Sequence, residues 1–201
     1  MAGAVAGGRP GSVRSRTGKA AALARLLHRD CTRLLELYRE REHFPPEFSP
    51  EKGRMVPVAP SAPHLSPSER VCLLHSALRQ CLGLLERVIG WEEEQGADGE
   101  GEYRSVRNTV RDRLGHLLQS TKALLVDGEG MAAVTPDPNN AEEMDGLGRE
   151  GVFGAKLWAY RVLQELIHWT HSTAQTLHAL QTDREKERGK MGKKGKAGVQ
   201  S

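Results

Sequence analysis

Pairs of glutamate and histidine three residues apart are the first residues in this chain whose spacing could support chemistry. Glu40 and His43 form one pair, and Glu165 and His168 form another. In helical di-iron enzymes, a Glu-x-x-His pair on each of two helices holds the metals, with one inward Glu on each of the other two. Here one pair lies beside prolines at the end of a predicted helix, whereas the other lies mid-helix. The two pairs therefore cannot share one layer, which argues against a di-iron site.

Zinc binding is a second possible chemistry. The closest combinations are Cys72 with His75 and His168 with His171, and each supplies two ligands where a zinc site needs about four. The glycines lie in loops and tails, without the strand or the Gly-Lys-Ser/Thr sequence of a phosphate-binding loop, and no nucleophile constellation is recognisable. We therefore expect no enzyme activity, no metal and no cofactor, and we expect the function to lie in surface recognition.

Four segments that could position a recognition surface carry apolar residues at helical spacing, and none shows the alternation typical of a strand. The first segment stops before Pro45 and Pro46. The second begins with a capping box, in which Ser66 precedes Pro67 and Glu69. The expected helices span about Thr17–Glu42, Pro67–Glu94, Glu102–Val126 and Val152–Gln181.

The lengths of the connections predict how these helices are arranged. A helix of about 25 residues is about 38 Å long, and residues 95–101 reach at most about 25 Å. The second and third helices must therefore be antiparallel. Residues 43–66 and 127–151 are long enough to run the length of the bundle. The expected fold is all-α: a long-chain four-helix bundle with up-up-down-down topology and two long crossover loops.

The length of 201 residues favours one domain. No apolar run is long enough to span a membrane, and no cleavable signal peptide is visible. Cys31, Cys72 and Cys81 lie in leucine-rich segments. Their odd number argues against a disulfide framework holding the fold, so we expect reduced thiols. We expect a disordered basic segment at 1–16, the helical domain at 17–182 and a disordered basic tail at 183–201.

The positive charge is concentrated at the two ends of the chain. Residues 1–20 contain four basic and no acidic residues, and residues 183–201 contain seven basic and three acidic ones, so the middle is net acidic. A protein that binds nucleic acid usually carries its basic excess on the folded surface. The basic isoelectric point therefore does not predict a nucleic-acid partner for the folded domain.

The last predicted helix is apolar on two sides. Its main stripe centres on Leu163, and Trp158, Val162 and Trp169 lie almost opposite. The first crossover could cover this second stripe, or the stripe could be an exposed partner-binding face. The crossover residues available for such packing are Phe44, Phe48, Val56, Val58 and Leu65.

Phe153 and Lys156 stand one turn apart where the last helix opens, and Phe153 lies at the edge of the main stripe. An aromatic residue beside a cation is a common composition for a binding hot spot. A packing role at the helix start is equally compatible with this spacing. If the pair is a hot spot, we expect folding to depend little on either residue.

Three stretches of the chain carry a resemblance to a known family. They are GVFGAKLWAYRVLQELIHWT at Gly151–Thr170, LARLLHRD at Leu23–Asp30, and the Val56-Pro57-Val58 sequence that precedes Ser66–Arg70. Together they resemble the ciliary neurotrophic factor family of interleukin-six-type helical cytokines. The Gly-Val-Phe-x-Ala-Lys form also resembles cardiotrophins. The family's arginines after the Trp-Thr of the last helix are absent, because Ser172 and His178 stand there.

The resemblance implies a neurotrophic cytokine that assembles receptors and activates JAK/STAT signalling, without a cofactor. Phe153 and Lys156 match the Phe-x-x-Lys motif that engages the leukaemia inhibitory factor receptor. Arg25 corresponds to the face for the non-signalling ciliary neurotrophic factor receptor alpha, and His28 in the same run is a further expected receptor contact. Asp30 lies on the first helix, whose exposed side would meet the shared interleukin-six-family transducer together with the third helix.

The resemblance further implies cytoplasmic storage and action outside the cell after non-classical release, because ciliary neurotrophic factor also lacks a signal peptide. We expect a monomer or weak dimer, with no nucleic acid and no membrane insertion. A different reading is an intracellular helical adaptor whose basic tail, Arg184–Lys196, contacts acidic partners or nucleic acid. Removing the tail would distinguish the two, because the cytokine contacts lie on the bundle.

Overall fold

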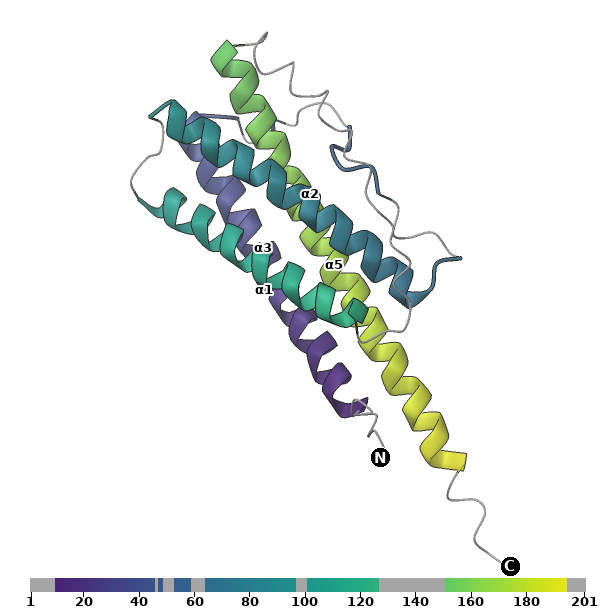
Figure 1. The fold of residues 1–201 in the computed structure, drawn as a ribbon. Coiled ribbons are helices and arrows are strands. Elements are labelled where there is room, and N and C mark those ends of the chain that lie inside the picture. The colour runs from purple at the N-terminus through teal and green to yellow at the C-terminus, as the bar shows by residue number, and fades with distance from the viewer. Residues whose placement is uncertain are drawn as a thin grey trace, which may run out of the picture.

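A computed structural model of the chain describes residues 10–45, 47–48, 53–58, 64–96, 101–126 and 151–194. These residues form four helices and contain no strand, so the expected all-α fold is confirmed (Figure 1). The helices are α1 (Pro10–Glu42), α2 (Pro67–Glu94), α3 (Glu102–Val126) and α5 (Gly151–Lys194).

The helices have the predicted up-up-down-down arrangement. In Figure 1, α1 and α2 run in one direction, and α3 and α5 run in the opposite direction. Among the described helices, α1 and α2 each pack against α3 and α5, but α1 does not pack against α2, and α3 does not pack against α5. Helices of the same direction therefore lie diagonally across the bundle, and every packed pair is antiparallel.

The predicted apolar stripes form the core between these helices. The fully buried large side chains come from every helix, and each predicted stripe contributes to them. They include Leu27, Leu34 and Tyr38 of α1, Leu74, Leu78 and Leu85 of α2, Leu114 and Leu117 of α3, and Leu163, Leu166 and Trp169 of α5. Close packing of this kind favours a single arrangement of the four helices.

The start of α2 is the capping box expected from the sequence. The Ser66 hydroxyl accepts a hydrogen bond from the Glu69 backbone N–H at 3.3 Å, and the Glu69 carboxylate accepts one from the Ser66 N–H at 2.7 Å. Two N–H groups that the helix cannot pair internally are thereby satisfied. The box fixes where the first crossover ends and α2 begins.

Two helices are longer than their apolar patterns predict. Helix α1 begins at Pro10 rather than Thr17, and α5 continues to Lys194 rather than ending at Gln181. Extending an existing helix costs much less free energy than nucleating one, and polar pairs one turn apart support it. Asp183 pairs with Lys186 at 3.9 Å, for example. The segment expected as a tail therefore starts as a continuation of α5, and residues 1–9 and 195–201 lie outside the described residues.

The first crossover packs on α5, as one of the two alternatives for the second apolar stripe predicted. Met55 and Val56 are buried in the main core, and the Tyr160 hydroxyl donates to the Phe48 carbonyl at 3.2 Å. The Tyr160 ring also contacts the rings of Phe44 and Phe48 edge to face, with centroids 5.4 and 5.6 Å apart. Tyr160 lies on the side of the main stripe. On the opposite side of α5, Val162 and Trp169 are buried and the crossover residue Arg54 pairs with the neighbouring Glu165, so the second stripe is covered at these two residues, as expected.

The two tryptophans expected beneath the crossover differ in burial. Trp169 is 1% exposed and donates from Nε1 to the Glu165 carboxylate at 3.0 Å. Glu165 also accepts a hydrogen bond from the crossover residue Arg54 at 3.4 Å. Trp158 is partly exposed but packs against the main core, so both rings are mostly buried as predicted, Trp169 more completely than Trp158. The cover over α5 is incomplete near the start of the helix.

Cys31, Cys72 and Cys81 are all free thiols. Burial raises the pKa of the Cys31 and Cys81 thiols above the usual range, so these two stay protonated and behave as small apolar core residues. Within the described part of the chain, no helix is both long enough and apolar enough to cross a bilayer.

Candidate functional site

The glutamate–histidine pairs that could have supported metal chemistry are separated in the structure. Helix α1 ends at Glu42, and His43 lies beyond it with a positive φ of 57°. The Glu165 carboxylate already accepts hydrogen bonds from the Trp169 indole and from the Arg54 guanidinium. Among the residues that the structure describes, no three His, Cys, Asp or Glu side chains come close enough to hold a metal ion. The expected contact residues lie on α1 and α5.

Phe153 lies in the first turn of α5 with its side chain in solvent. It is 65% exposed, and the adjacent Val152 is 57% exposed. Among the large apolar residues that the structure describes, these two and Val126 are the most exposed. An exposed phenylalanine beside an exposed valine loses stabilisation by remaining in water, because each could bury its apolar area against a partner. The packing role that the sequence left open for Phe153 is not seen in this structure.

Lys156 lies one turn after Phe153 and is held by α1. Its Nζ is 2.5 Å from Oε2 of Glu42, and the Glu42 side chain is only 8% exposed. Its carbonyl accepts a hydrogen bond from the Tyr38 hydroxyl at 3.0 Å. The expectation that folding depends little on Lys156 therefore needs correction, because removing the ammonium would take a charge partner from a nearly buried carboxylate.

A buried ionic network lies behind this contact. Arg41 donates to Glu42 at 2.8 Å and to Glu92 at 2.5 Å. Glu92 is completely buried and also accepts hydrogen bonds from Arg107 at 2.5 Å and from Tyr103 at 2.8 Å. The network therefore joins side chains of α1, α2 and α3, and Lys156 adds α5 to it.

The aromatic rings of this network also stabilise its charges. The Arg41 guanidinium lies 4.0 Å from the centroid of the Tyr103 ring and 5.0 Å from that of Tyr38, which allows cation–π attraction. Burial, reinforced by nearby carboxylates, raises the pKa of the Tyr38 and Tyr103 hydroxyls. Both tyrosines therefore remain neutral hydrogen-bond donors.

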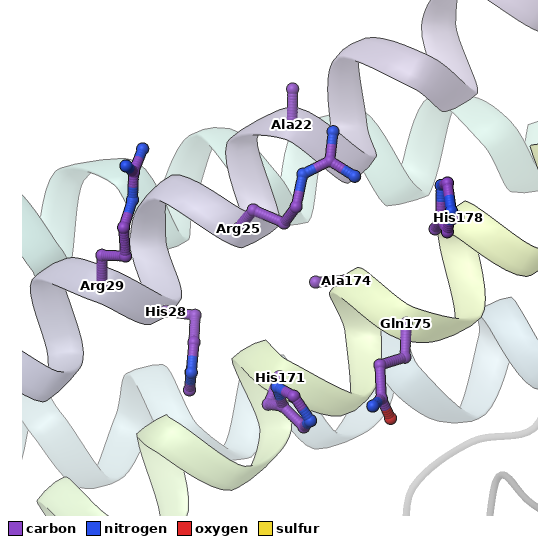
Figure 2. A pocket seen from close by; sticks show the side chains of 8 residues that line it. All are labelled: Ala22, Arg25, His28, Arg29, His171, Ala174, Gln175 and His178. Atoms are coloured by element: carbon purple, nitrogen blue, oxygen red, sulfur yellow. The ribbon is translucent and has the colours of Figure 1, made fainter.

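Arg25 and His28 line a groove between α1 and α5 (Figure 2). The groove has a volume of about 650 Å³, and its lining contains arginine and histidine but no carboxylate. Its lining residues are Ala22, Arg25, His28, Arg29, His171, Ala174, Gln175 and His178. A groove with this composition suits an anionic or hydrogen-bond-accepting partner.

His28 is the least exposed polar group of this groove on α1. Its Nδ1 lies 3.2 Å from the Ile167 carbonyl, and because a carbonyl only accepts, Nδ1 carries the proton. Figure 2 shows its ring pointing toward α5, where the ring of His171 lies with its centroid 5.0 Å away. The contact fixes the orientation of His28, whereas Arg25 is exposed.

Asp30 lies on a different side of α1. It is half-buried and forms an ion pair with Arg113 of α3. A second ion pair joins the same two helices, between Arg33, one turn after Asp30 on α1, and Glu102 of α3 at 2.9 Å. Asp30 therefore lies on the surface between α1 and α3.

The five expected contact residues thus occupy three surfaces rather than one site. Phe153 and Lys156 are brought together at the start of α5, Arg25 and His28 share the α1–α5 groove, and Asp30 lies between α1 and α3. Separate surfaces are what a protein needs if it contacts several partners at once.

The residues that hold Lys156 did not stand out in the sequence. Glu42 and Glu92 looked like ordinary charged residues near helix ends, yet both are nearly or fully buried. A signal was present in α3, where Tyr103 and Arg107 continue the spacing of Val110 and Leu114 onto the core face. An arginine at such a position indicates a buried carboxylate partner.

An up-up-down-down four-helix bundle in which the first and last connections of the chain are long is the architecture of the growth-hormone and cytokine bundles. Within that class, a sequence model of the ciliary neurotrophic factor family matches residues 4–195. The chain therefore belongs to the ciliary neurotrophic factor family, a family of neurotrophic cytokines.

Individual relatives agree with this family. Ciliary neurotrophic factor of Oryctolagus cuniculus is 26% identical over 160 residues, which cover 79% of this chain and 78% of the relative. Ciliary neurotrophic factor of Mus musculus is 26% identical over 164 residues, which cover 79% of each chain. The identity is low, but the match extends over most of both proteins.

Proposed function

We propose that this protein acts outside the cell as a neurotrophic cytokine that brings receptor chains together and so activates JAK/STAT signalling. The observation that carries the proposal is the exposed Phe153 at the start of α5, in a chain of the ciliary neurotrophic factor family. Its ring stands beside Val152 and one turn from a cation held in place. This combination supports a hot spot for a receptor.

Each surface is assigned one receptor in this proposal. The start of α5, with Phe153 and Lys156, binds the leukaemia inhibitory factor receptor. The groove with Arg25 and His28 binds the ciliary neurotrophic factor receptor alpha, and the α1–α3 surface with Asp30 binds the shared interleukin-six-family transducer. The separation of the surfaces supports simultaneous binding, because partners on different sides of the bundle do not compete for the same residues.

Storage in the cytoplasm and release by a non-classical route complete the proposal. The three free thiols support it, since reduced cysteines persist in the cytoplasm. Fractionation of producing cells, with assay of both the lysate and the medium, tests this part separately. Recovery only through the classical secretory pathway would contradict it.

The central experiment applies the purified protein to cells that express defined combinations of the three receptors. Phosphorylation of STAT proteins should require the two signalling receptors, and Phe153→Ala should abolish most of the response. Glu86→Gln is a matched surface control, because Glu86 is exposed on α2, which carries none of the three proposed receptor surfaces. Activity in cells without these receptors, or full activity of Phe153→Ala, would contradict the proposal.

A further inference from the structure

The first turn of α5 has little packing of its own. Gly151, Val152 and Phe153 are all exposed, and Gly151 has a positive φ of 65°, so the chain enters the helix without a side-chain anchor. The first N–H groups of a helix have no intrahelical partner, and unsupported ends fray. Something outside this turn must therefore hold Phe153 in one position if it is to serve as a rigid anchor.

Two contacts from α1 supply that support, and both reach Lys156. Glu42 binds its ammonium at 2.5 Å, and the Tyr38 hydroxyl donates to its carbonyl at 3.0 Å. The two contacts secure the side chain and the backbone of the same residue. Tyr38 is itself completely buried, so its hydroxyl has a fixed position.

Glu42 is in turn held by residues deeper in the bundle. Arg41 donates to Glu42 and to Glu92, so one guanidinium connects the two carboxylates. Glu92 is fully buried and is bound by Arg107 and Tyr103 of α3. With these partners, the Glu92 side chain has little freedom to move. Because Arg41 binds both Glu92 and Glu42, Glu92 also limits the movement of Glu42 near the surface.

We infer that Glu42 is a positioning residue for the receptor contact at the start of α5, and that Glu92 supports it through Arg41. Glu42 holds the Lys156 ammonium in place one turn after Phe153 and prevents the first turn of α5 from fraying before the receptor binds. This inference rests on the proposed function, because the receptor contact is part of that proposal. It adds a residue that sequence patterns did not single out.

Holding Lys156 in one conformation before the receptor binds raises the affinity, because the free-energy cost of ordering this side chain is not paid during binding. In Glu42→Gln the carboxylate is replaced by a neutral amide of nearly the same shape. The Lys156 ammonium then loses its ionic partner and samples several rotamers. The affinity for the leukaemia inhibitory factor receptor ectodomain should fall about tenfold, which is the size expected when an interface side chain must be ordered during binding.

A double-mutant cycle distinguishes positioning from a general loss of stability. Glu42→Gln, Lys156→Met and the double variant are compared by their affinity for the immobilised receptor ectodomain. If Glu42 acts through Lys156, Glu42→Gln should cause no further loss once Lys156 is methionine. Additive losses would overturn the inference. Glu36→Gln is the matched control, since it makes the same chemical change at an exposed position of α1.

Affinity for the ciliary neurotrophic factor receptor alpha provides a second control. The groove with Arg25 and His28 lies elsewhere on α1 and α5, so Glu42→Gln should leave this affinity unchanged. An equal loss at both receptors would show that Glu42 stabilises the whole bundle and would overturn its assigned role. Glu92→Gln should weaken binding of the leukaemia inhibitory factor receptor more than binding of the ciliary neurotrophic factor receptor alpha. Because Glu92 is fully buried, this variant should also have a lower melting temperature.

Hydrogen exchange in the free protein tests the positioning without any receptor. Amides of residues 155–158 donate to carbonyls one turn earlier, so they report on the opening of the first turn. Their exchange should be about tenfold faster in Glu42→Gln than in the wild type, while amides in the middle of α5 should be unaffected. Unchanged exchange would overturn the inference. If the wild type binds no receptor, the proposed function fails, and the exchange rates still decide whether Glu42 positions this turn.

Discussion

Two aromatic residues of α5 illustrate how one helix can serve stability and recognition separately. Trp169 is fully buried and hydrogen-bonded to Glu165, whereas Phe153 is 65% exposed and contacts solvent. Truncation of a buried ring leaves a cavity, while truncation of an exposed ring leaves the folded state almost unchanged. Truncation of Trp169 should therefore reduce stability, whereas truncation of Phe153 should reduce receptor binding and leave stability nearly unchanged.

Phe153→Ala should weaken binding of the leukaemia inhibitory factor receptor by roughly thirtyfold. Moving the ring from water into a receptor pocket contributes about 2 kcal/mol, and about 1.4 kcal/mol corresponds to a factor of ten. Surface plasmon resonance gives the affinity, and a thermal melt should show no clear change. A large drop in melting temperature would mean that Phe153 packs against the protein after all.

Trp169→Ala should lower the free energy of unfolding by about 3 to 5 kcal/mol. The lost free energy comes from the cavity and from the hydrogen bond between Nε1 and Glu165. Urea unfolding followed by circular dichroism measures it. Trp158→Ala is the control and should cost less, because Trp158 is only half-buried. Equal losses at the two positions would contradict this explanation.

At the scale of the elements, the start of α2 shows how a short polar motif defines a helix boundary. Ser66 and Glu69 exchange hydrogen bonds between side chain and backbone, and Pro67 occupies the first turn. The motif was readable in the sequence because its residues are close along the chain. Its contribution should be measurable without disturbing the core.

Ser66→Ala should reduce the free energy of unfolding by about 1 kcal/mol, which is typical for the loss of an N-cap side chain. The alanine cannot accept a hydrogen bond from the Glu69 N–H. Ser68→Ala, within the first turn of α2 and exposed, is the matched control and should have almost no effect. Chemical denaturation of both variants gives the comparison, and equal effects would argue against a capping role.

The same motif predicts a dependence of stability on pH. Hydrogen bonds from Ser66 lower the pKa of the Glu69 carboxyl in the folded protein. The charge of Glu69 therefore stabilises the fold above the pKa of the unfolded chain, and this contribution is lost as pH falls through the lower folded value. Relative to Glu69→Gln, which keeps a capping side chain, the wild type should lose its advantage below about pH 4. Unfolding curves from about pH 7 to 3 provide the test.

The helices and their directions could be predicted from the sequence because they depend on local spacing and on the reach of short connections. The first turns of α1 and the last turns of α5 could not be predicted. These turns contain no apolar stripe and are supported by polar pairs such as Asp183 with Lys186. The contacts of Lys156 also escaped prediction. Glu42 and Lys156 are far apart in sequence, and only the packing of α1 on α5 brings them together.

At the scale of the whole molecule, the bundle presents three separated surfaces, and α5 continues beyond the residues that contact the core. Leu177 is the last fully buried residue of α5 among those described, and Asp183, Glu185 and Lys186 are exposed. The end of α5 therefore projects from the bundle, as Figure 1 also shows. Its residues are available for removal without opening the core.

Deletion of residues 187–201 should leave the melting temperature and all three receptor affinities nearly unchanged. The deleted part begins beyond the last core contact of α5, and the proposed receptor surfaces lie on the bundle. Thermal melts and receptor binding of the shortened chain check this. Loss of function with an intact fold would instead favour the intracellular adaptor, whose basic tail is its binding element.

The diagonal placement of α1 and α2 also affects the order of folding. Of the described helices, α2 and α3 are the pair that both follow one another in sequence and pack together. Closing the short connection between them costs less chain entropy than bringing α1 to α3 or α5. We therefore expect an α2–α3 hairpin in the folding transition state, with α1 docking late. Core truncations in α1, such as Leu27→Ala, should mainly accelerate unfolding, whereas those in α3, such as Leu114→Ala, should slow folding.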